Sequence, residues 1–166
     1  MSGPLKGIVV LDLTHVLAGP FAAMVLADLG ATVIKIEQPG VGDRSRASGP
    51  FIQEESTYFM SINRGKKGMS LDLKKEKGKN TFLKLVEKAD VIVENMSPGA
   101  MKRLGLGYDI LSGHNPGIIY ASISGFGQTG PYSNKGALDV IIQGMGGVMS
   151  ITGEPGGPPI LSLIHI

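Results

Sequence analysis

The stretch KGIVVLDLTHVLAGPFAAMVLADLGATVIKIE (residues 6–37) decides the fold class. Residues 6–13 are apolar and rich in β-branched side chains, which is the composition of a short buried strand. A helix follows: Pro20 suits its first position, where no backbone N–H is needed, and Gly30 suits a left-handed cap just past its end. Residues 32–37 then read as a second strand. The stretch predicts a βαβ unit with parallel strands joined by a right-handed crossover.

The middle of the chain repeats this alternation of strands and helices. A helix predicted over residues 74–89 is amphipathic, and its apolar face is formed by Phe82, Leu85, Val86 and Ala89. Further strands are predicted over residues 69–73, 90–94 and 117–124. Strands that alternate with helices are typical of a parallel sheet. We therefore expect the α/β class, with a Rossmann-like, doubly wound parallel sheet that forms part of one domain over residues 1–160.

The composition excludes several kinds of site. With 166 residues, 42% of them hydrophobic, the chain is long enough for one domain with a core. It has no cysteine, which excludes disulfides and thiolate metal sites, and its three histidines lack metal-binding spacing. A net charge of +2 does not by itself argue for a nucleic-acid partner. No signal peptide or membrane-spanning run is evident, so we expect a cytoplasmic protein without a membrane partner.

Small, polar and glycine-rich segments follow four of the expected strands. These segments are residues 15–20, 38–43, 95–99 and 125–131. In open parallel sheets, ligands bind outside the carboxyl ends of the strands, and glycine lets the backbone approach a ligand closely. Each segment alone is compatible with a tight turn. Together, on one edge of a sheet, the four segments predict a ligand site.

A basic cluster lies between Arg64 and Lys84. Such a cluster can hold a phosphate-rich ligand. We interpret Lys75, Lys77 and Lys79 as a solvated helix face. A phosphate role is more plausible for Arg64, Lys66 and Lys67, which lie in a loop before a strand. No aromatic residues are interleaved with the cluster, so RNA binding has little support.

Other features leave alternatives open. Residues 125–130 read GFGQTG and match the dinucleotide fingerprint G-x-G-x-x-G, which keeps a nicotinamide-dependent oxidoreductase among the alternatives. That fingerprint needs a helix directly after it, whereas residues 131–136 read as a loop, so we interpret the match as accidental. Glu37 ends a strand, where it could contact a ribose hydroxyl or lie at the surface. We interpret His15 as a ligand-lining or structural histidine.

The same segments carry a resemblance to a known family. The run LKGIVVLDLTHVLAGPFAAMVLADLGATVIKIEQPGVGD and the later blocks STYFMSINRGKK, SLDLK, DVIVENMSPGAMKRLGLGYD, NPGIIYASISGFGQTGPY and GEPGGPP occur in family order from Leu5 to Ile160. They resemble the class III CoA-transferases, which include the formyl-CoA and carnitine-type CoA-transferases. The resemblance implies a Rossmann-like large domain that binds coenzyme A as its acyl thioester, in a homodimer of interlaced chains.

The resemblance also implies a set of CoA contacts. They fall on Val16, Leu17, Gln38, Leu71, Asp72, Leu73, Lys74, Asn95, Met96, Ser97, Arg103, Gly136, Ala137, Leu138 and Asp139. Two positions depart from the family pattern. Position 38 is often arginine, so Gln38 offers a CoA phosphate a hydrogen bond without a charge. Position 17 is glutamine in members similar to formyl-CoA transferase. Leu17 therefore argues against formyl-CoA as the substrate of this chain.

The chemistry implied by the resemblance moves CoA from an acyl-CoA to a small carboxylic acid, without a metal. An enzyme aspartate attacks the thioester to give a mixed anhydride, and the released CoA thiolate then forms an aspartyl thioester. The related α-methylacyl-CoA racemases have a sequence similar to Gly-His-Asp at the positions of Ala137, Leu138 and Asp139. Their histidine transfers a proton, which Leu138 cannot do. The racemase activity is therefore a distant alternative.

The nucleophilic aspartate of the family lies after the GEPGGPP block, in a stretch similar to VGVPIADLAAG that this sequence lacks. We interpret Asp139 as a CoA-proximal or structural carboxylate instead. Residues 161–166, LSLIHI, match no family block but match one reading frame of a transposon-derived sequencing adaptor. We expect Ile160 to be the last native residue and the fragment to be inactive. A genuine short protein that binds CoA without catalysis is the alternative.

Overall fold

The computed structural model describes residues 3–162, and they group into two compact units that divide between Ile123 and Ser124. The first unit holds the sheet and most of the predicted site residues. The second unit begins after the last strand of that sheet. Residues 163–166 of the proposed adaptor-derived tail lie outside the described residues, so that hypothesis stays a prediction.

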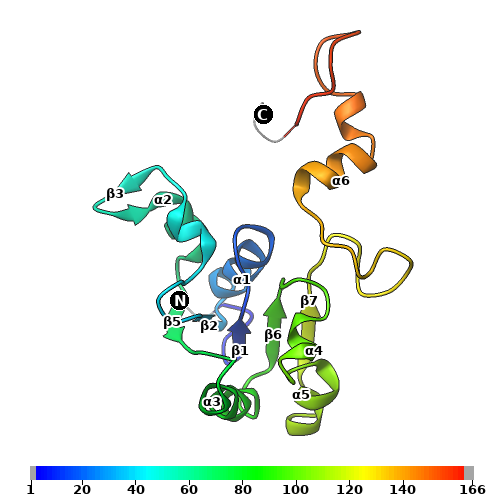
Figure 1. The fold of residues 1–166 in the computed structure, drawn as a ribbon. Coiled ribbons are helices and arrows are strands. Elements are labelled where there is room, and N and C mark those ends of the chain that lie inside the picture. Colours follow the sequence, from blue (N-terminus) through cyan, green and yellow to red (C-terminus); the bar gives the residue numbers. More distant parts are fainter. Residues whose placement is uncertain (1–2, 163–166) are drawn as a thin grey trace. The chain divides into compact units, whose positions relative to one another are not determined.

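A five-stranded parallel sheet forms the centre of the first unit (Figure 1). Its strands lie in the order β5-β2-β1-β6-β7. Their bounds are Val9–Asp12 (β1), Thr32–Glu37 (β2), Lys67–Ser70 (β5), Val91–Glu94 (β6) and Ile119–Ser122 (β7). The chain first moves outward from β1 through β2 to β5, then crosses to β6 and β7 on the other side of β1. The predicted α/β class is confirmed, and the reversal between β1 and β6 creates a topological switch point.

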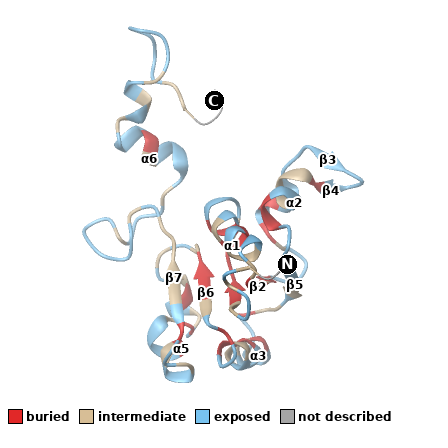
Figure 2. Cartoon of the chain, turned by 180° about the vertical axis from the view of Figure 1, so that it is seen from behind, coloured by how far each residue is buried: buried red, intermediate tan, exposed pale blue. Residues whose placement is uncertain are grey.

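Helices cover both faces of this sheet. Successive side chains of each central strand point to opposite faces and are mostly apolar, so both faces need to be covered. On one face, Val10 and Val33 pack with Ala23 of helix α1, which spans Ala18–Asp28. On the other face, Leu11 and Ile92 pack with Phe82 of helix α3 (Glu76–Val86). Helices α4 (Ala100–Arg103) and α5 (Tyr108–His114) complete this second layer. Figure 2 shows buried residues on the central strands and on the helices that cover them, whereas β7 at the edge of the sheet is only partly buried.

Most predicted elements are present, with shifted ends. The strand over residues 32–37 is confirmed residue for residue, and Gly30 takes the left-handed conformation expected beyond α1, with φ of 102°. The strand predicted over residues 69–73 lies earlier in the sequence, since β5 spans Lys67–Ser70 and Leu73 instead joins the core. Side chains of residues 71–73 alternate in hydrophobicity like a strand, but the chain turns there toward α3.

The segment between β2 and β5 has more structure than its glycine and proline content predicts. It contains a 3-10 helix, η1 (Arg44–Ala47), a two-stranded hairpin of β3 (Phe51–Ile52) and β4 (Glu55–Ser56), and helix α2 (Thr57–Asn63). Side-chain caps begin both helical turns: Asp43 accepts from the Ser45 N–H at 2.9 Å, and Ser56 accepts from the Phe59 N–H at 3.1 Å. The pattern of hydrophobic residues does not predict these helix-capping hydrogen bonds, because they are made by polar side chains.

The second unit has little regular structure over its described residues. Helix α6 spans Asp139–Met145 and is followed by a 3-10 turn, η2, over Val148–Ser150. No helix opens after Gly130, which confirms that the G-x-G-x-x-G match is accidental. A hollow of about 440 Å³ is lined by residues 149–159, none of which is a predicted contact. In the described part of the chain, no helix has the length and apolar character needed to cross a membrane.

The contact of α3 with the preceding loop predicts a steric effect at Gly78. A Cβ atom there would lie 1.9 Å from the carbonyl oxygen of Asp72, whereas a Cβ at Gly113 of α5 meets nothing within 4 Å. We expect Gly78→Ala to lower the free energy of unfolding by about 1–3 kcal/mol, because backbone must shift. We expect Gly113→Ala to raise it by up to about 1 kcal/mol, because alanine favours a helix. Urea denaturation of both variants tests this, and equal effects would contradict it.

Candidate functional site

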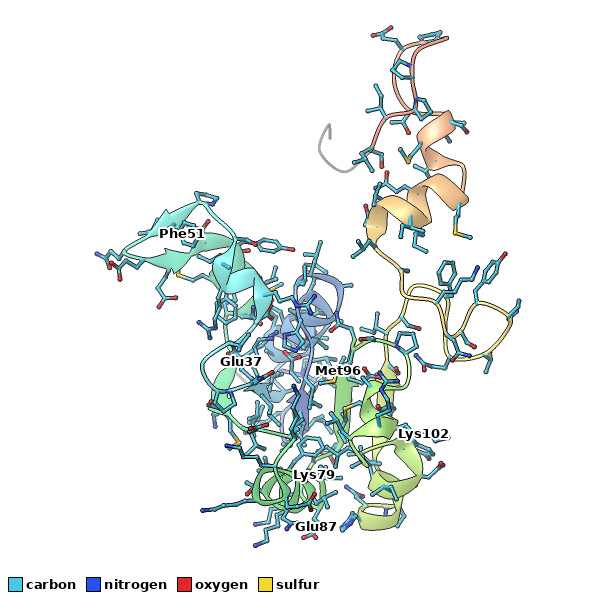
Figure 3. The ribbon with its side chains drawn as sticks, viewed as in Figure 1. Glu37, Phe51, Lys79, Glu87, Met96 and Lys102 are labelled. Atoms are coloured by element: carbon cyan, nitrogen blue, oxygen red, sulfur yellow. The ribbon has the colours of Figure 1, made fainter. Side chains whose placement is uncertain are left out.

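The candidate site lies at the carboxyl edge of the sheet, at the switch point between β1 and β6. The segment after β1 leads into α1, and the segment after β6 leads into α4. Figure 3 shows Glu37, which ends β2, and Met96, which follows β6, toward the same end of the sheet, with Lys79 of α3 and Glu87 just past α3 at the other end. The topology therefore brings the loops that follow β1, β2 and β6 to one edge.

Asn95 joins the two loops that flank the switch point. Its Oδ1 accepts from the His15 N–H, and its Nδ2 donates to the His15 carbonyl oxygen, each at 2.8 Å. Both polar atoms of the amide are thus used to hold a backbone that lies 80 residues away in the sequence. The loop after β1 is fixed against the loop after β6 by this reciprocal pair.

Val16 has an unusual backbone conformation for a β-branched residue. Its φ is +70°, in the left-handed region that such side chains rarely adopt. Its N–H donates to Oδ1 of Asp43 at 3.0 Å. Strain of this kind persists where the surroundings over-determine the conformation, and it gathers at functional sites. The side chains of Val16 and of Leu17 are 43% and 45% exposed, so this held loop presents apolar groups outward at the head of α1.

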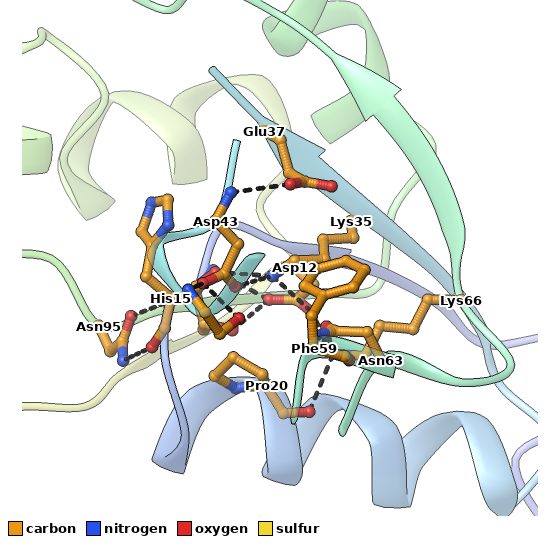
Figure 4. A network of polar contacts seen from close by, with 12 residues as sticks. Asp12, His15, Pro20, Lys35, Glu37, Asp43, Phe59, Asn63, Lys66 and Asn95 are labelled. Atoms are coloured by element: carbon orange, nitrogen blue, oxygen red, sulfur yellow. Dashed lines mark hydrogen bonds and ion pairs between the residues drawn. The ribbon is translucent and has the colours of Figure 1, made fainter. Parts of the chain in front are cut away.

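A buried network of two lysines and two aspartates lies beneath this loop (Figure 4). Lys35 of β2 contacts Oδ2 of Asp43 at 2.8 Å and donates to the Thr14 carbonyl oxygen at 2.8 Å. Lys66 donates to Oδ2 of Asp12 at 2.8 Å, to the Pro20 carbonyl oxygen at 2.9 Å and to Oδ1 of Asn63 at 2.8 Å. All four charged side chains are at most 2% exposed.

The network perturbs the pKa values of its members. Burial by itself would raise the pKa of Asp43, but hydrogen bonds from Lys35 and from the N–H groups of Val16 and Ser45 outweigh it and lower that pKa to about 2. Burial lowers the pKa of Lys66, and the carboxylate of Asp12 opposes this effect. Asp43 is therefore ionised throughout the neutral range, as its ion pair with Lys35 requires.

This network corrects the phosphate hypothesis for the basic loop. Lys66 is enclosed and its ammonium group is occupied by three oxygen acceptors, so it is not available to an external phosphate. Arg64 pairs with Asp28 at 2.6 Å. Lys67 is exposed on the edge strand β5. The sequence shows a cluster of charges but not that one of them turns inward. Lys75, just before α3, and Lys77 of α3 are exposed, in agreement with a solvated face, whereas Lys79 is only partly exposed and pairs with Glu76 at 3.0 Å.

Glu37 also differs from its interpretation as a surface acid. It is only 9% exposed, and its two carboxylate oxygens accept from Nε and Nη2 of Arg46 at 2.7 and 2.8 Å. This bond from Arg46 lowers the pKa of Glu37, with burial acting in the opposite direction. The Arg46 guanidinium also lies 3.7 Å from the ring centroid of Phe59. Glu37 thus holds η1 and α2 at the end of β2.

The predicted contacts of the first unit gather at the carboxyl edge. Those with exposed side chains are Val16, Leu17, Gln38, Lys74, Ser97 and Arg103. Asn95, Met96, Leu71 and Asp72 are half-buried, and Leu73 is buried in the core, so its side chain does not face a ligand. The Leu71 N–H donates to the Glu37 carbonyl oxygen at 2.9 Å, which places the loop after β5 beside Gln38. Arg103 donates from Nη1 to the Pro98 carbonyl oxygen at 3.1 Å.

The remaining four predicted contacts belong to the second unit. Gly136, Leu138 and Asp139 are exposed, and Ala137 is half-buried. Asp139 lies in the first turn of α6, where its Oδ2 accepts from Nε2 of Gln143 at 2.5 Å. This bond agrees with the structural interpretation of that carboxylate. Whether these four residues contact CoA stays a prediction.

Sequence reasoning missed two acids that shape the site. Asp43 pairs with Lys35 and holds Val16, although in the sequence it is only one polar residue of a loop. Glu94, 6% exposed at the end of β6, accepts from the Met96 N–H at 2.8 Å and also from Ser122 and Tyr120. Burial and this carboxylate raise the pKa of Tyr120. Among the described residues, no group of three histidine, aspartate or glutamate side chains is placed to hold a metal ion.

Comparison with known proteins identifies a family and its relatives. The family described as CoA-transferase family III matches this chain over residues 5–166. The acetyl-CoA:oxalate CoA-transferase of Acetobacter aceti is 54% identical over 157 residues, which cover 95% of this chain and 40% of that protein. The succinyl-CoA:glutarate CoA-transferase of Mus musculus is 50% identical over 158 residues, covering 95% of this chain and 36% of that protein.

Solved structures agree with these sequence matches. A CAIB/BAIF family protein from Brucella suis is 43% identical and superposes with a TM-score of 0.90, covering 97% of this chain and 44% of that one. Rv3272 from Mycobacterium tuberculosis is 41% identical with a TM-score of 0.86 over 95% of this chain. The chain spans about two fifths of the length of these relatives.

The buried network predicts opposite outcomes for two adjacent lysines. We expect Lys66→Met to lower the free energy of unfolding by about 3–5 kcal/mol, because the carboxylate of Asp12 loses its closest cation inside the fold. The matched change Lys67→Met removes an exposed charge, and we expect a change within about 0.5 kcal/mol. Urea denaturation at neutral pH measures both values. A mild effect of Lys66→Met would refute the role assigned to this ammonium group.

The lowered pKa of Asp43 predicts that the free energy of unfolding decreases at acidic pH. Because the folded pKa of about 2 lies below the ordinary value of 3.8, the stabilisation is complete above pH 4 and is lost as the pH falls toward 2. The loss is on the order of 2 kcal/mol. We expect Asp43→Asn to be less stable at pH 7 and to have a flatter profile between pH 4 and 2. Glu54→Gln, which changes an exposed turn residue, is the control and should retain the slope of the parent chain.

Proposed function

The chain belongs to CoA-transferase family III, since the family matches residues 5–166, and from this we propose that the carboxyl edge of its sheet binds an acyl-CoA. The observation that carries the proposal is the held loop over residues 15–17. Reciprocal bonds from Asn95 and a bond from Asp43 fix this loop at the switch point of the sheet, with Val16 strained and exposed. Because the loop is already ordered, ligand binding does not incur the loss of conformational entropy that ordering a flexible loop would cost.

The charges at this edge support an anionic ligand. Lys74 and Arg103 are exposed there, and Arg103 pairs with no described acid. Helix α1 begins at Ala18 with no side chain capping its N-terminus and no acid in its first turn. The free N–H groups of such a helix end favour a phosphate or carboxylate. At the same edge, Gln38 adds a neutral donor after β2, and Leu17 adds an exposed apolar group before α1 in place of a polar one.

We propose CoA transfer between an acyl-CoA and a small carboxylic acid as the activity to which this binding surface contributes. The names of the relatives support this reaction class, with oxalate as the acid for one and glutarate for another. The proposed steps are those implied by the family resemblance: attack of an aspartate on the thioester, a mixed anhydride, and an aspartyl thioester. The family resemblance puts that aspartate in a stretch after GEPGGPP that has no counterpart in this sequence. For this chain the proposal is therefore acyl-CoA binding, and the interlaced homodimer is proposed with it.

Leu17 provides the direct test of the proposed surface. We expect calorimetric titration to show saturable binding of CoA to the chain. We expect Leu17→Glu to weaken that binding at least tenfold, because it places a carboxylate beside the phosphates of the ligand. The matched control is Val25→Glu, which changes another exposed apolar residue of α1 about two turns away from the edge.

The two variants separate local repulsion from a general effect of added charge. Equal weakening by both changes would mean that net charge, rather than this edge, controls binding. Tight binding of NAD without binding of CoA would contradict the proposed function and favour the oxidoreductase alternative. Thermal unfolding of each variant in the absence of ligand checks that its fold is retained.

A further inference from the structure

The imidazole of His15 is a polar group at the switch point that the fold itself does not use. Its Nδ1 is buried and has no hydrogen-bond partner among the described residues. Its Nε2 is not enclosed in this way and donates to no described residue. Figure 4 shows the ring directed away from the buried network, while the backbone of the same residue is joined to Asn95. The backbone of His15 is therefore held in place, while its ring makes no hydrogen bond to the described residues.

Three hydrogen bonds fix the backbone that carries this ring. Asn95 binds both the N–H and the carbonyl oxygen of His15, and Asp43 accepts from the N–H of the next residue, Val16. None of these bonds involves the imidazole. The backbone on both sides of the Cα is therefore restrained, and the imidazole leaves the chain from a fixed point at the switch point of the sheet. A ligand contact benefits from such a fixed point of attachment.

The surroundings favour the neutral ring in the absence of a ligand. Burial lowers the pKa of His15, Asp43 opposes this, Lys35 and Arg44 add to the lowering, and Asp12 opposes it. These groups come from β1, β2 and the segment that leads into η1, while residues 95–99 after β6 carry no titratable side chain. In the neutral ring, a proton on Nε2 leaves only a lone pair at the enclosed Nδ1, which costs less than an enclosed N–H without an acceptor. The donor is therefore on the accessible nitrogen.

Arg44 adds a cation in the neighbourhood of His15. It is exposed, it pairs with no described acid, and its charge is close enough to affect His15. An anionic oxygen placed at Nε2 would accept a hydrogen bond from the ring and be attracted by the guanidinium. The two groups together match a phosphate or a carboxylate and disfavour a cation.

We propose that Nε2 of His15 donates a hydrogen bond to an anionic oxygen of the bound ligand, with Asn95 as its positioning residue. The proposal rests on the proposed function, because that function supplies two sources of such an oxygen. One is a phosphate of CoA, and the other is the carboxylate of the acid that exchanges with it. Asn95, which the family resemblance marks as a CoA contact, acts here through His15, since its amide is already occupied.

The first measurement is the titration of His15 by NMR, alone and with saturating CoA, oxalate or glutarate. An anion at Nε2 favours the imidazolium, so we expect the pKa of His15 to rise on binding of the ligand that supplies the oxygen. By linkage, that ligand should bind more tightly as the pH falls from 8 to 5. A shift with CoA alone assigns the oxygen to a phosphate, and a shift with the acid alone assigns it to the carboxylate. No shift with any of these ligands overturns the proposal.

Variants of the chain provide the second measurement. We expect His15→Leu to weaken binding of the shifting ligand about tenfold, and His15→Gln, which keeps a donor, to restore part of the affinity without its pH dependence. His114→Leu changes an exposed histidine on α5 and is the matched control. Asn95→Asp keeps the acceptor for the His15 N–H but loses the donor to the His15 carbonyl oxygen, so it should weaken binding and also lower the midpoint of thermal unfolding.

The outcomes separate this inference from the proposed function. If CoA binds and Leu17→Glu weakens it, but His15→Leu matches His114→Leu, the His15 proposal is wrong and the proposed function stands. If the unaltered chain binds neither CoA nor the acids, the proposed function fails and the His15 proposal fails with it. Equal loss of affinity in His15→Gln and His15→Leu, with loss of the native thermal transition in both, would show that the ring is structural.

Discussion

The enclosure of two lysine ammonium groups in the first unit is the constraint on which the rest of the structure depends. Lys35 and Lys66 are almost fully buried, and a buried charge is tolerated only where partners surround it. Asp12 and Asp43 supply the opposite charges, and backbone carbonyl groups of residues 14 and 20 supply further acceptors. Satisfying these two cations requires β1, β2, α1 and the end of α2 to meet at one place. The carboxyl edge of the sheet is thereby assembled before any ligand is considered.

Asp43 connects this buried network to the exposed site. One of its oxygens lies against Lys35, and the other accepts from the N–H groups of Val16 and Ser45. The ion pair holds the carboxylate in place, and the carboxylate in turn maintains a backbone conformation at Val16 that a β-branched residue rarely adopts. Asn95 adds a second restraint from the other side of the switch point. The same carboxylate of Asp43 thus balances the charge of a buried lysine and restrains the exposed loop.

Several properties of the site were predictable from the sequence because they depend on local patterns. Apolar, β-branched runs predicted the parallel strands, and the rule for open parallel sheets then predicted the ligand edge. The loops named in advance around His15, Gln38 and Asn95 do lie at that edge, because the carboxyl ends of parallel strands meet there. The roles of Lys66 and Glu37 were not predictable. Each is a charged residue next to a strand, and nothing in the neighbouring residues shows whether such a side chain turns inward.

The sequence by itself determined the α/β class, the βαβ unit and the alternation of the main strands with helices, and the family through long ordered motifs. Only the tertiary structure decided which charges are buried, which amide holds which loop, and which histidine nitrogen is accessible. The physical reason is the distance along the chain over which each interaction acts. Strand and helix patterns repeat within a few residues, whereas Lys66 with Asp12 and Asn95 with His15 are joined across 54 and 80 residues. Such pairs are specified by packing of the whole first unit, and no local pattern encodes them.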